Sequence, residues 1–270
     1  MKKNILLVVL IFTGVRADVS ALELKKIYPF STSLPGNILR FHFLFDEPVL
    51  SGDAASALRF TTADGKELHQ IFLESPTELW NQDRTLLTVY LNPARIKQPL
   101  SAFRKNGPHF LPGDQITLNI DQRFRNNEGK LISDSYTYSF TVEKPVRGRP
   151  SPRQWKISTP EAGSRAMLMI NFPVSMDLFT LKYGLNLVKG GQPMEGVIFQ
   201  SRDGKAWGFR PDTPWQKVAY QIIVDRRIED VCGNTLSGAF EWIPSDRVNR
   251  GQSENLFLTF SPGGQDFHST

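Results

Sequence analysis

The side chains best suited to chemistry gather between Trp215 and Leu236, in WQKVAYQIIVDRRIEDVCGNTL. This stretch holds five groups with oxygen or sulfur atoms that can bind a cation or attack a substrate: Asp225, Glu229, Asp230, Cys232 and Asn234. Carboxylate and amide oxygens from neighbouring turns are the ligands that Ca²⁺ prefers, and a cysteine thiolate is a nucleophile. The spacing matches no defined calcium loop, and no histidine lies near Cys232 in the sequence. We therefore predict neither a metal site nor a catalytic cysteine here.

Other groups that could do chemistry are scattered along the chain. The four histidines lack zinc-binding spacing such as HExxH: His42, His69, His109 and His268. Asp46-Glu47 and Glu229-Asp230 could be read as the acid/base couples of a glycoside hydrolase, but adjacent strand residues point to opposite faces. The sequence has no GxSxG elbow, phosphate loop or dinucleotide fingerprint. We predict no catalytic, cofactor-binding or metal-binding residues.

Tryptophan side chains are the remaining candidates for ligand binding. An exposed planar set would form a platform on which sugars stack, whereas buried tryptophans pack sandwich cores or a domain junction. The chain has five: Trp80, Trp155, Trp207, Trp215 and Trp242. We expect packing for most of them. Trp155, Trp207 and Trp215 are our candidates for ligand or domain-junction contacts, with Trp155 wedged between the domains.

The N-terminal residues indicate export. Two lysines, an apolar run from Ile5 to Val15 and the small residues before Leu22 predict a cleavable signal peptide over residues 1–21. An uncleaved anchor is the alternative, although Arg16 and Asp18 interrupt the segment. With a single cysteine the chain cannot form an internal disulfide, which favours a bacterial envelope protein over a eukaryotic secreted one. A net charge of +5 is mild and does not indicate nucleic acid as a partner.

The rest of the chain alternates apolar and polar residues between turn signals. ILRFHFLFD places Leu39, Phe41, Phe43 and Phe45 on one face, as expected of a half-buried strand. AMLMINF repeats this pattern in the second half, and no long amphipathic helix is predicted. Short strands with turns between them predict two tandem β-sandwiches, over residues 22–143 and 157–262.

The two predicted domains are joined and followed by polar segments. Residues 144–156 contain prolines and five basic side chains, which predicts a semi-rigid linker. Its charge could meet an anionic surface, but a solvated linker is the plainer interpretation. Residues 263–270 are expected to be a frayed tail.

The stretch from Tyr220 to Gly233 has an earlier copy. YQIIVDRRIEDVCGN aligns with ITLNIDQRFRNNEG at a constant offset that places Asp225 on Asp121, Arg227 on Arg123 and Gly233 on Gly129. The copy replaces four of the groups able to do chemistry with Arg125, Asn126, Glu128 and Lys130. Both copies keep what a turn between strands requires. We therefore interpret Tyr220, Asp230, Gly233 and Asn234 as a structural turn motif.

The segment from Pro211 to Asn234, with its Pro-rich turn, leading tyrosine, VD and GN, resembles the bacterial Ig-like domains of the S-layer-protein type. Over most of residues 27–260 the chain looks like a group of exported bacterial proteins that carry two such domains. Cys232 departs from the small residue usual in that family, and the first domain has Gly129-Lys130 in place of Gly-Asn. The resemblance implies an envelope or surface role and no catalytic residues.

The sequence is compatible with three functions. The favoured one is a non-enzymatic exported protein of the periplasm or cell surface, with two immunoglobulin-like sandwiches that serve as a structural or interaction module. Its partner would be a protein or a glycan of the envelope, and its mature chain would have no transmembrane segment. The second is a carbohydrate-binding protein that uses exposed Trp or Tyr. The third is a hydrolase with an unrecognised site.

Overall fold

The computed structural model describes residues 21–50, 54–73, 78–98, 100–241, 255–264 and 268–269. The predicted signal peptide lies outside this part of the chain except for its last residue. Within the described residues, no helix is both long and apolar enough to cross a membrane.

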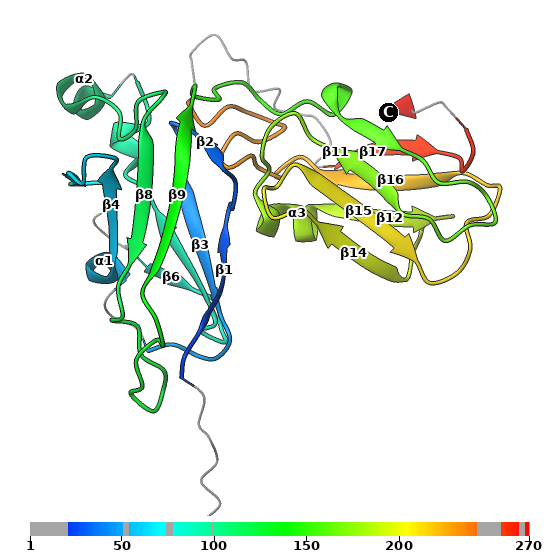
Figure 1. Ribbon diagram of the computed structural model, residues 1–270. Coiled ribbons are helices and arrows are strands. Elements are labelled where there is room, and N and C mark those ends of the chain that lie inside the picture. The colour runs from blue at the N-terminus through cyan, green and yellow to red at the C-terminus, as the bar shows by residue number, and fades with distance from the viewer. Residues whose placement is uncertain are drawn as a thin grey trace, which may run out of the picture.

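The first half folds into two sheets (Figure 1). One has four strands in the order β1-β3-β7-β6: β1 Leu24–Tyr28, β3 Arg40–Phe45, β7 Leu86–Tyr90 and β6 Glu78–Trp80. The other has five strands in the order β2-β9-β8-β4-β5: β2 Ser33–Pro35, β9 Tyr136–Glu143, β8 Gln115–Ile120, β4 Leu58–Thr62 and β5 Glu67–Leu68. Short helices connect them: α1 Ala54–Ala57, the 3₁₀ helix η1 Pro93–Arg95 and α2 Ser101–Asn106.

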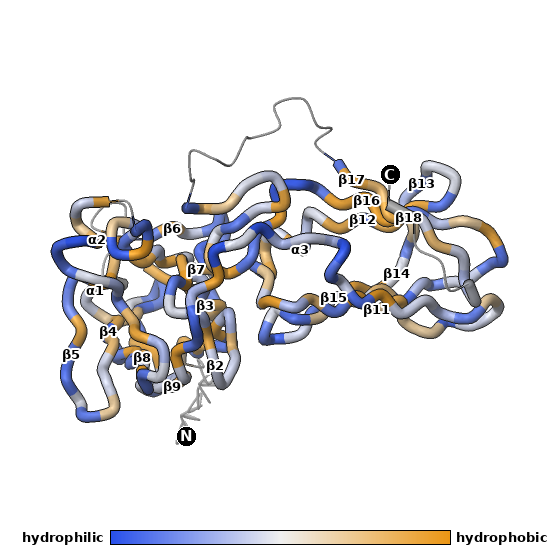
Figure 2. Tube along the Cα trace, turned by 90° about the horizontal axis from the view of Figure 1, so that it is seen from above, coloured by the Kyte–Doolittle hydropathy of each residue, from blue (hydrophilic) through white to orange (hydrophobic). Residues whose placement is uncertain are grey.

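The second half repeats this plan. Its four-stranded sheet has the order β10-β11-β15-β14: β10 Lys156–Ser158, β11 Leu168–Asn171, β15 Ala206–Pro211 and β14 Gly196–Gln200. Its five-stranded sheet has the order β13-β12-β16-β17-β18: β13 Gln192–Pro193, β12 Leu185–Lys189, β16 Tyr220–Asp225, β17 Asn255–Phe260 and β18 His268–Ser269. The 3₁₀ helix η2 (Pro152–Gln154) precedes this half, and α3 (Leu178–Gly184) leads into β12. Figure 2 shows β11, β14 and β15 on one side of the second sandwich and β12, β16 and β17 on the other. The predicted all-β fold of two immunoglobulin-like sandwiches is confirmed.

The two halves also share their strand register. In the first sandwich Ile120 pairs with Leu58 on one side and Tyr136 on the other. Val224, the residue that aligns with Ile120, pairs in the same way with Leu185 and Leu256. Because the pairing partners correspond as well, the sequence repeat extends to the whole sheet and not to one hairpin alone.

Alternating apolar residues build both cores. Phe41, Phe43 and Phe45 are buried on β3, and Ile222 and Val224 are buried on β16, because every second side chain of a strand points to the same face. The facing sheets bury these rings and branched side chains against one another. Burial of this kind supplies the main stabilisation of each sandwich.

Three further segments belong to the second half. Residues 239–241 have no regular structure. In the C-terminal segment, His268–Ser269 pair with β17 as β18. The stretch after Asp177 forms both a helical turn and a strand, α3 and β12. The exact domain limits at residues 143, 156 and 262 remain predictions.

Candidate functional site

The polar groups that the fold gathers lie where the two sandwiches meet. Loops at one end of the second sandwich, with α3 beside them, contact the outer face of the β1-β3 side of the first sandwich (Figure 1). Strand β3 turns its phenylalanines inward, so Arg40 and His42 point outward toward these loops. The alternation that fills the core therefore also presents a basic face to the other sandwich.

A buried ion network joins the two sandwiches at this face. Asp177 accepts hydrogen bonds from Arg40 (Nε–Oδ2, 3.0 Å) and from His42 (Nε2–Oδ2, 2.9 Å). Arg40 also donates to Glu229 through Nη2 and to Tyr90 through Nη1. The side chains of Arg40 and Asp177 are 10% and 3% exposed, so this pair is shielded from water. A shielded pair is held strongly once formed, and it is costly to break from one side.

The charges in this network stabilise one another. Burial alone would lower the pKa of Arg40, but the carboxylates of Asp177 and Glu229 outweigh it and raise that pKa. Burial likewise tends to raise the pKa of Asp177, yet the hydrogen bond from His42 and the charge of Arg40 hold it well below its usual range. Asp177 therefore remains a carboxylate at neutral pH. Its second oxygen accepts the backbone N–H of Thr180 and so caps helix α3.

The turn after Ile228 continues the junction. Asp230 accepts the backbone N–H groups of Cys232 and Asn234 at 2.9 Å, and its other oxygen accepts the Asn234 side chain. Gly233 has φ +83°, a backbone conformation that suits glycine. Because this turn is closed from within, it reaches the first sandwich as a rigid tip.

The tip of the turn enters the core of the first sandwich. Val231 and Cys232 pack into the first hydrophobic cluster although they belong to the second half of the chain. The backbone N–H of Leu39 donates to the carbonyl of Val231 at 2.9 Å, and the thiol of Cys232 donates to Asn37 at 3.2 Å. Cys232 is 1% exposed, and burial raises the pKa of its thiol. A buried, protonated thiol is a packing group and a poor nucleophile.

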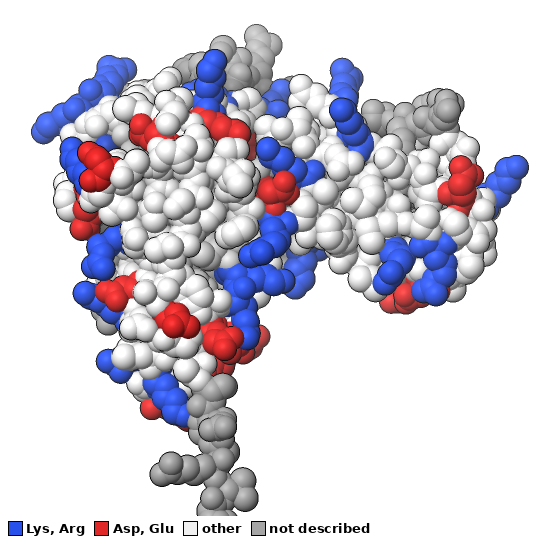
Figure 3. Space-filling model, in the orientation of Figure 1, with Lys and Arg blue, Asp and Glu red and all other residues white. Residues whose placement is uncertain are grey.

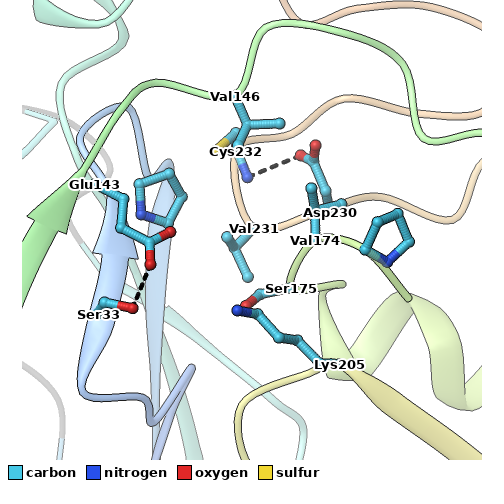
Figure 4. A pocket seen from close by; sticks show the side chains of 11 residues that line it. Ser33, Glu143, Val146, Val174, Ser175, Lys205, Asp230, Val231 and Cys232 are labelled. Atoms are coloured by element: carbon cyan, nitrogen blue, oxygen red, sulfur yellow. Dashed lines mark hydrogen bonds between the residues drawn. The ribbon is translucent and has the colours of Figure 1, made fainter. Parts of the chain in front are cut away.

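A cavity of about 40 Å³ lies beside this tip. Figure 4 shows Asp230 and Cys232 on one side of it, Ser33 and Glu143 on another, and Lys205 reaching toward Ser175. Such a volume holds a few water molecules. Burial raises the pKa of Asp230 to about 6, against the hydrogen bonds that it accepts. This is the one strongly raised carboxyl pKa among the described residues, and its oxygens are used by the turn.

The predicted turn motif is brought together only in part. Asp230, Gly233 and Asn234 share one turn at the junction. Tyr220 lies in the second sandwich core, where its hydroxyl accepts the backbone N–H of Gln216 at 2.9 Å. This contact holds the strand start to the preceding loop, as the tyrosine corner of immunoglobulin domains does.

The three tryptophans proposed for ligand or junction contacts lie elsewhere. Trp155, Trp207 and Trp215 are all buried in the core of the second sandwich. Trp155 packs edge-on against Phe172 within that core, so its expected position between the domains is wrong. The large rings serve the core of the second sandwich because they fill the space between its sheets. Trp242 lies outside the described residues.

The oxygens considered for calcium are not arranged around a common point. Asp225 binds Arg227, Glu229 binds Arg40, and Asp230 closes its own turn. In the part of the chain that the structure describes, no group of three His, Cys, Asp or Glu side chains could hold a metal ion.

Sequence reasoning missed the junction residues Arg40, His42 and Asp177. The available signal was the alternation of Arg40 and His42 with phenylalanines, which places two polar groups on the outward face of a strand. An outward histidine is usually solvated, so this pattern does not predict a partner. Asp177, the partner of His42, lies 135 residues away in the chain. The two residues come together only because the second sandwich docks on the first.

Comparison with known proteins gives weak structural similarity. No model of a known protein family matches the sequence, and no curated protein sequence matches it. Among solved structures, native α2-macroglobulin of E. coli is similar at 11% identity over 64% of this chain, with a TM-score of 0.29. This chain spans 9% of the length of that protein. The N-terminal four Ig domains of Dscam1 isoform 6.44 are similar at 11% identity, with a TM-score of 0.25, over 80% of this chain and 49% of that one. The sandwich assignment itself stands on the sheets described above.

Proposed function

We propose that this chain is a non-enzymatic interaction module of the bacterial cell envelope, whose two immunoglobulin-like sandwiches are held in one fixed relative orientation. The sequence pattern of a signal peptide supports export, and the resemblance to S-layer-type Ig-like domains supports an envelope or surface location. Its partner would be a protein or a glycan of that compartment.

One observation carries the proposal: the side chains that could do chemistry are used to hold the sandwiches together. Arg40, His42, Asp177 and Glu229 satisfy each other across the junction. Asp230 accepts a hydrogen bond within the turn, and Cys232 at the tip of that turn packs in the core of the first sandwich. Because these buried charges hold the two sandwiches in a fixed arrangement, the chain is suited to presenting the surfaces of both sandwiches at a set distance and direction. In Figure 1 the strands of the second sandwich run across those of the first, so the two present different faces.

The carbohydrate-binding alternative needs exposed aromatic rings together on one face. Trp155, Trp207 and Trp215 are buried, and Trp80 packs against the first core. Among the described residues, no tryptophan therefore belongs to an exposed platform of this kind.

Small-angle X-ray scattering of the chain from Leu22 onward tests the fixed orientation. We expect one narrow distribution of intramolecular distances that fits the arrangement in Figure 1. Arg40→Met should broaden it, while the matched variant Arg59→Met should not, because Arg59 forms an exposed ion pair with Asp121 within the first sandwich. A broad distribution for the unaltered chain would contradict the proposal.

Affinity capture from envelope extracts, with a glycan array alongside, tests the interaction role. We expect one envelope component to be retained by the unaltered chain and by Arg59→Met, and retained less by Arg40→Met. Equal retention by all three would mean that the fixed orientation is not needed for binding. Turnover of a glycoside or ester substrate that Asp230→Asn abolishes would overturn the non-enzymatic assignment.

A further inference from the structure

The internal repeat gives each sandwich the same outer sheet face and the same loop end. In the first sandwich the outer face carries Arg40 and His42 on β3, which pair with Tyr90 and Thr88 on β7. In the second, β11 and β15 take the places of β3 and β7: Phe43 pairs with Leu87 as Ile170 pairs with Trp207. The face in the first sandwich is covered by the loop end of the second.

The corresponding face of the second sandwich carries exposed apolar side chains beside one exposed charge, Arg210, and no described residue covers it. Register places Met167 and Met169 where Arg40 and His42 stand in the first sandwich, and Gly208 where Thr88 stands. The sulfur atoms of both methionines lie over Gly208, where a Cβ would come within 2.6 Å of each. Val197 and Phe199 on β14 extend the same face and are 50% and 43% exposed. We call these five residues the methionine face. Figure 3 shows mostly uncharged surface over the middle of the second sandwich.

The loops at one end of the first sandwich, around Val49–Leu50 and Arg125–Leu131, form its loop end. Their backbone arrangement matches that of the docking loops of the second sandwich, around Met176–Asp177 and Glu229–Thr235. Val49 bridges Asn126 as Met176 bridges Asp230, and Arg125 bridges Leu131 as Glu229 bridges Thr235. All four of these bridges are antiparallel.

Hydrogen bonds at the loop ends correspond as well. Leu50 donates its N–H to the Arg125 carbonyl at 2.8 Å, as Asp177 donates to the Glu229 carbonyl at 2.8 Å. Leu50 thus occupies the position of Asp177, the residue that binds His42. Asn126 accepts the N–H groups two and four residues ahead, as Asp230 does.

The two surfaces that stay undocked within one copy differ from the docked surfaces in the same way, because an apolar residue replaces a polar one on each. The docked pair sets Asp177 against His42, a charged contact, whereas the corresponding unused pair sets Leu50 against Met169, an apolar contact. Leu50 and Leu131 are 45% and 41% exposed at the loop end of the first sandwich. Exposed apolar groups on both surfaces are typical of surfaces that become buried on association.

We propose that the methionine face binds the loop end of the first sandwich of a second copy of this chain, with Leu50 set against Met169. The contact repeats between copies the arrangement that the two sandwiches already make within one copy. It joins two different surfaces, so it is heterologous and builds rings or open chains of molecules. The inference is independent of the envelope role proposed above.

Sedimentation velocity of the chain from Leu22 onward, over a series of concentrations, tests this contact. The unaltered chain should show a sedimentation coefficient that rises with concentration. Leu50→Asp and Phe199→Glu should each remove that rise. Leu111→Asp is the matched control, because Leu111 is 57% exposed but precedes β8 at the opposite end of the first sandwich from the 121–135 loop. Circular dichroism melting curves should show that all three variants fold.

Mixing the two variants makes the test specific. Leu50→Asp keeps an intact methionine face and Phe199→Glu keeps an intact loop end, so an equimolar mixture should form a 1:1 dimer that grows no further. Three outcomes would overturn the proposal: an unaltered chain that stays monomeric at every concentration, a Leu50→Asp chain that still associates by pairing its methionine faces, or a mixture that forms no dimer.

Discussion

The turn Asn126–Leu131 and the turn Asp230–Thr235 have one backbone and two different roles. In each, a side-chain oxygen accepts two backbone N–H groups, and a glycine with positive φ follows three residues later. A Cβ on Gly129 would meet nothing within 4 Å, whereas a Cβ on Gly233 would lie 2.6 Å from Leu39 of the first sandwich. The backbone geometry of this turn is thus a property of the fold, while its use as a docking tip depends on the side chains around it.

The neighbouring charges show the same difference. The second loop end carries Asp177 and Glu229 and meets Arg40 and His42. The first carries Leu50 and Arg125 at the same positions, and Leu50 is exposed. The loop end of the second sandwich therefore differs from that of the first in a few side chains, and these allow it to dock on the other sandwich. The strands that carry the loops are the same in both.

Removing one partner from the buried network should have the largest effect on stability. Arg40→Met leaves Asp177 charged and shielded, and we expect a loss of about 3–5 kcal/mol in the free energy of unfolding. Urea denaturation measures it, with Arg59→Met as the exposed control at about 0–1 kcal/mol.

The triple variant Arg40→Met, His42→Met, Asp177→Leu gives the junction the residues of the unused pair. Replacing a buried ion pair by apolar groups of similar size is often neutral, so this variant should recover part of the lost stability. The recovery is incomplete because Glu229 loses Arg40 and helix α3 loses its Asp177 cap. Equal destabilisation of the single and triple variants would show that the two surfaces are not interchangeable.

Alanine at the two turn glycines should separate local strain from docking. Gly129→Ala should cost about 1–2 kcal/mol, the ordinary penalty of a left-handed backbone for a residue with a Cβ. Gly233→Ala carries that penalty and also forces Leu39 aside, which adds about 1–3 kcal/mol. Thermal unfolding of both variants measures the difference, and equal losses would contradict a docked tip.

The two carboxyls of the junction should give opposite pH dependences. Because the folded pKa of Asp177 is lowered, its contribution to stability is present above the pKa of the unfolded chain and is lost as the pH falls below about 4. Because the folded pKa of Asp230 is raised to about 6, its protonated form is favoured in the folded chain, and stability falls as the pH rises from about 4 to 6.

Asp230→Asn isolates the second contribution. Asn126 accepts the same two backbone N–H groups in the first turn, so an asparagine can close the turn. The variant should lose the decline between pH 4 and 6 and keep the loss at lower pH, as measured by urea denaturation across that range. An unchanged decline in Asp230→Asn would assign it to another group.

The smallest effects concern two tyrosines that anchor loops in different ways. Tyr138 in the first sandwich bonds both the N–H and the carbonyl of Ser31, whereas Tyr220 in the second accepts one N–H from Gln216. Phenylalanine at Tyr220 should cost about 1 kcal/mol and at Tyr138 up to about twice that. Thermal melting compares the two, and a larger loss at Tyr220 would reverse the ranking.

Local patterns in the chain were sufficient to predict the two sandwiches, the repeat between them and the turn at Gly233. Alternation of residues such as Phe41 and Phe43 is a property of neighbouring positions, and so is the requirement for glycine at positive φ. These signals are local, so they can be seen without knowing what any strand faces. Comparison of the two sequence copies likewise predicts a structural role for Asp230, because the first copy has Asn126 at that position.

The junction depended on contacts that no local pattern encodes. Arg40 and Asp177 are 137 residues apart in the sequence, and each alone resembles an ordinary surface charge. Trp155 shows the converse, since its position after the linker suggested the junction but the second core buried it. Which outward side chains become buried is decided when one sandwich docks on the other, because burial depends on shape and charge across the whole interface.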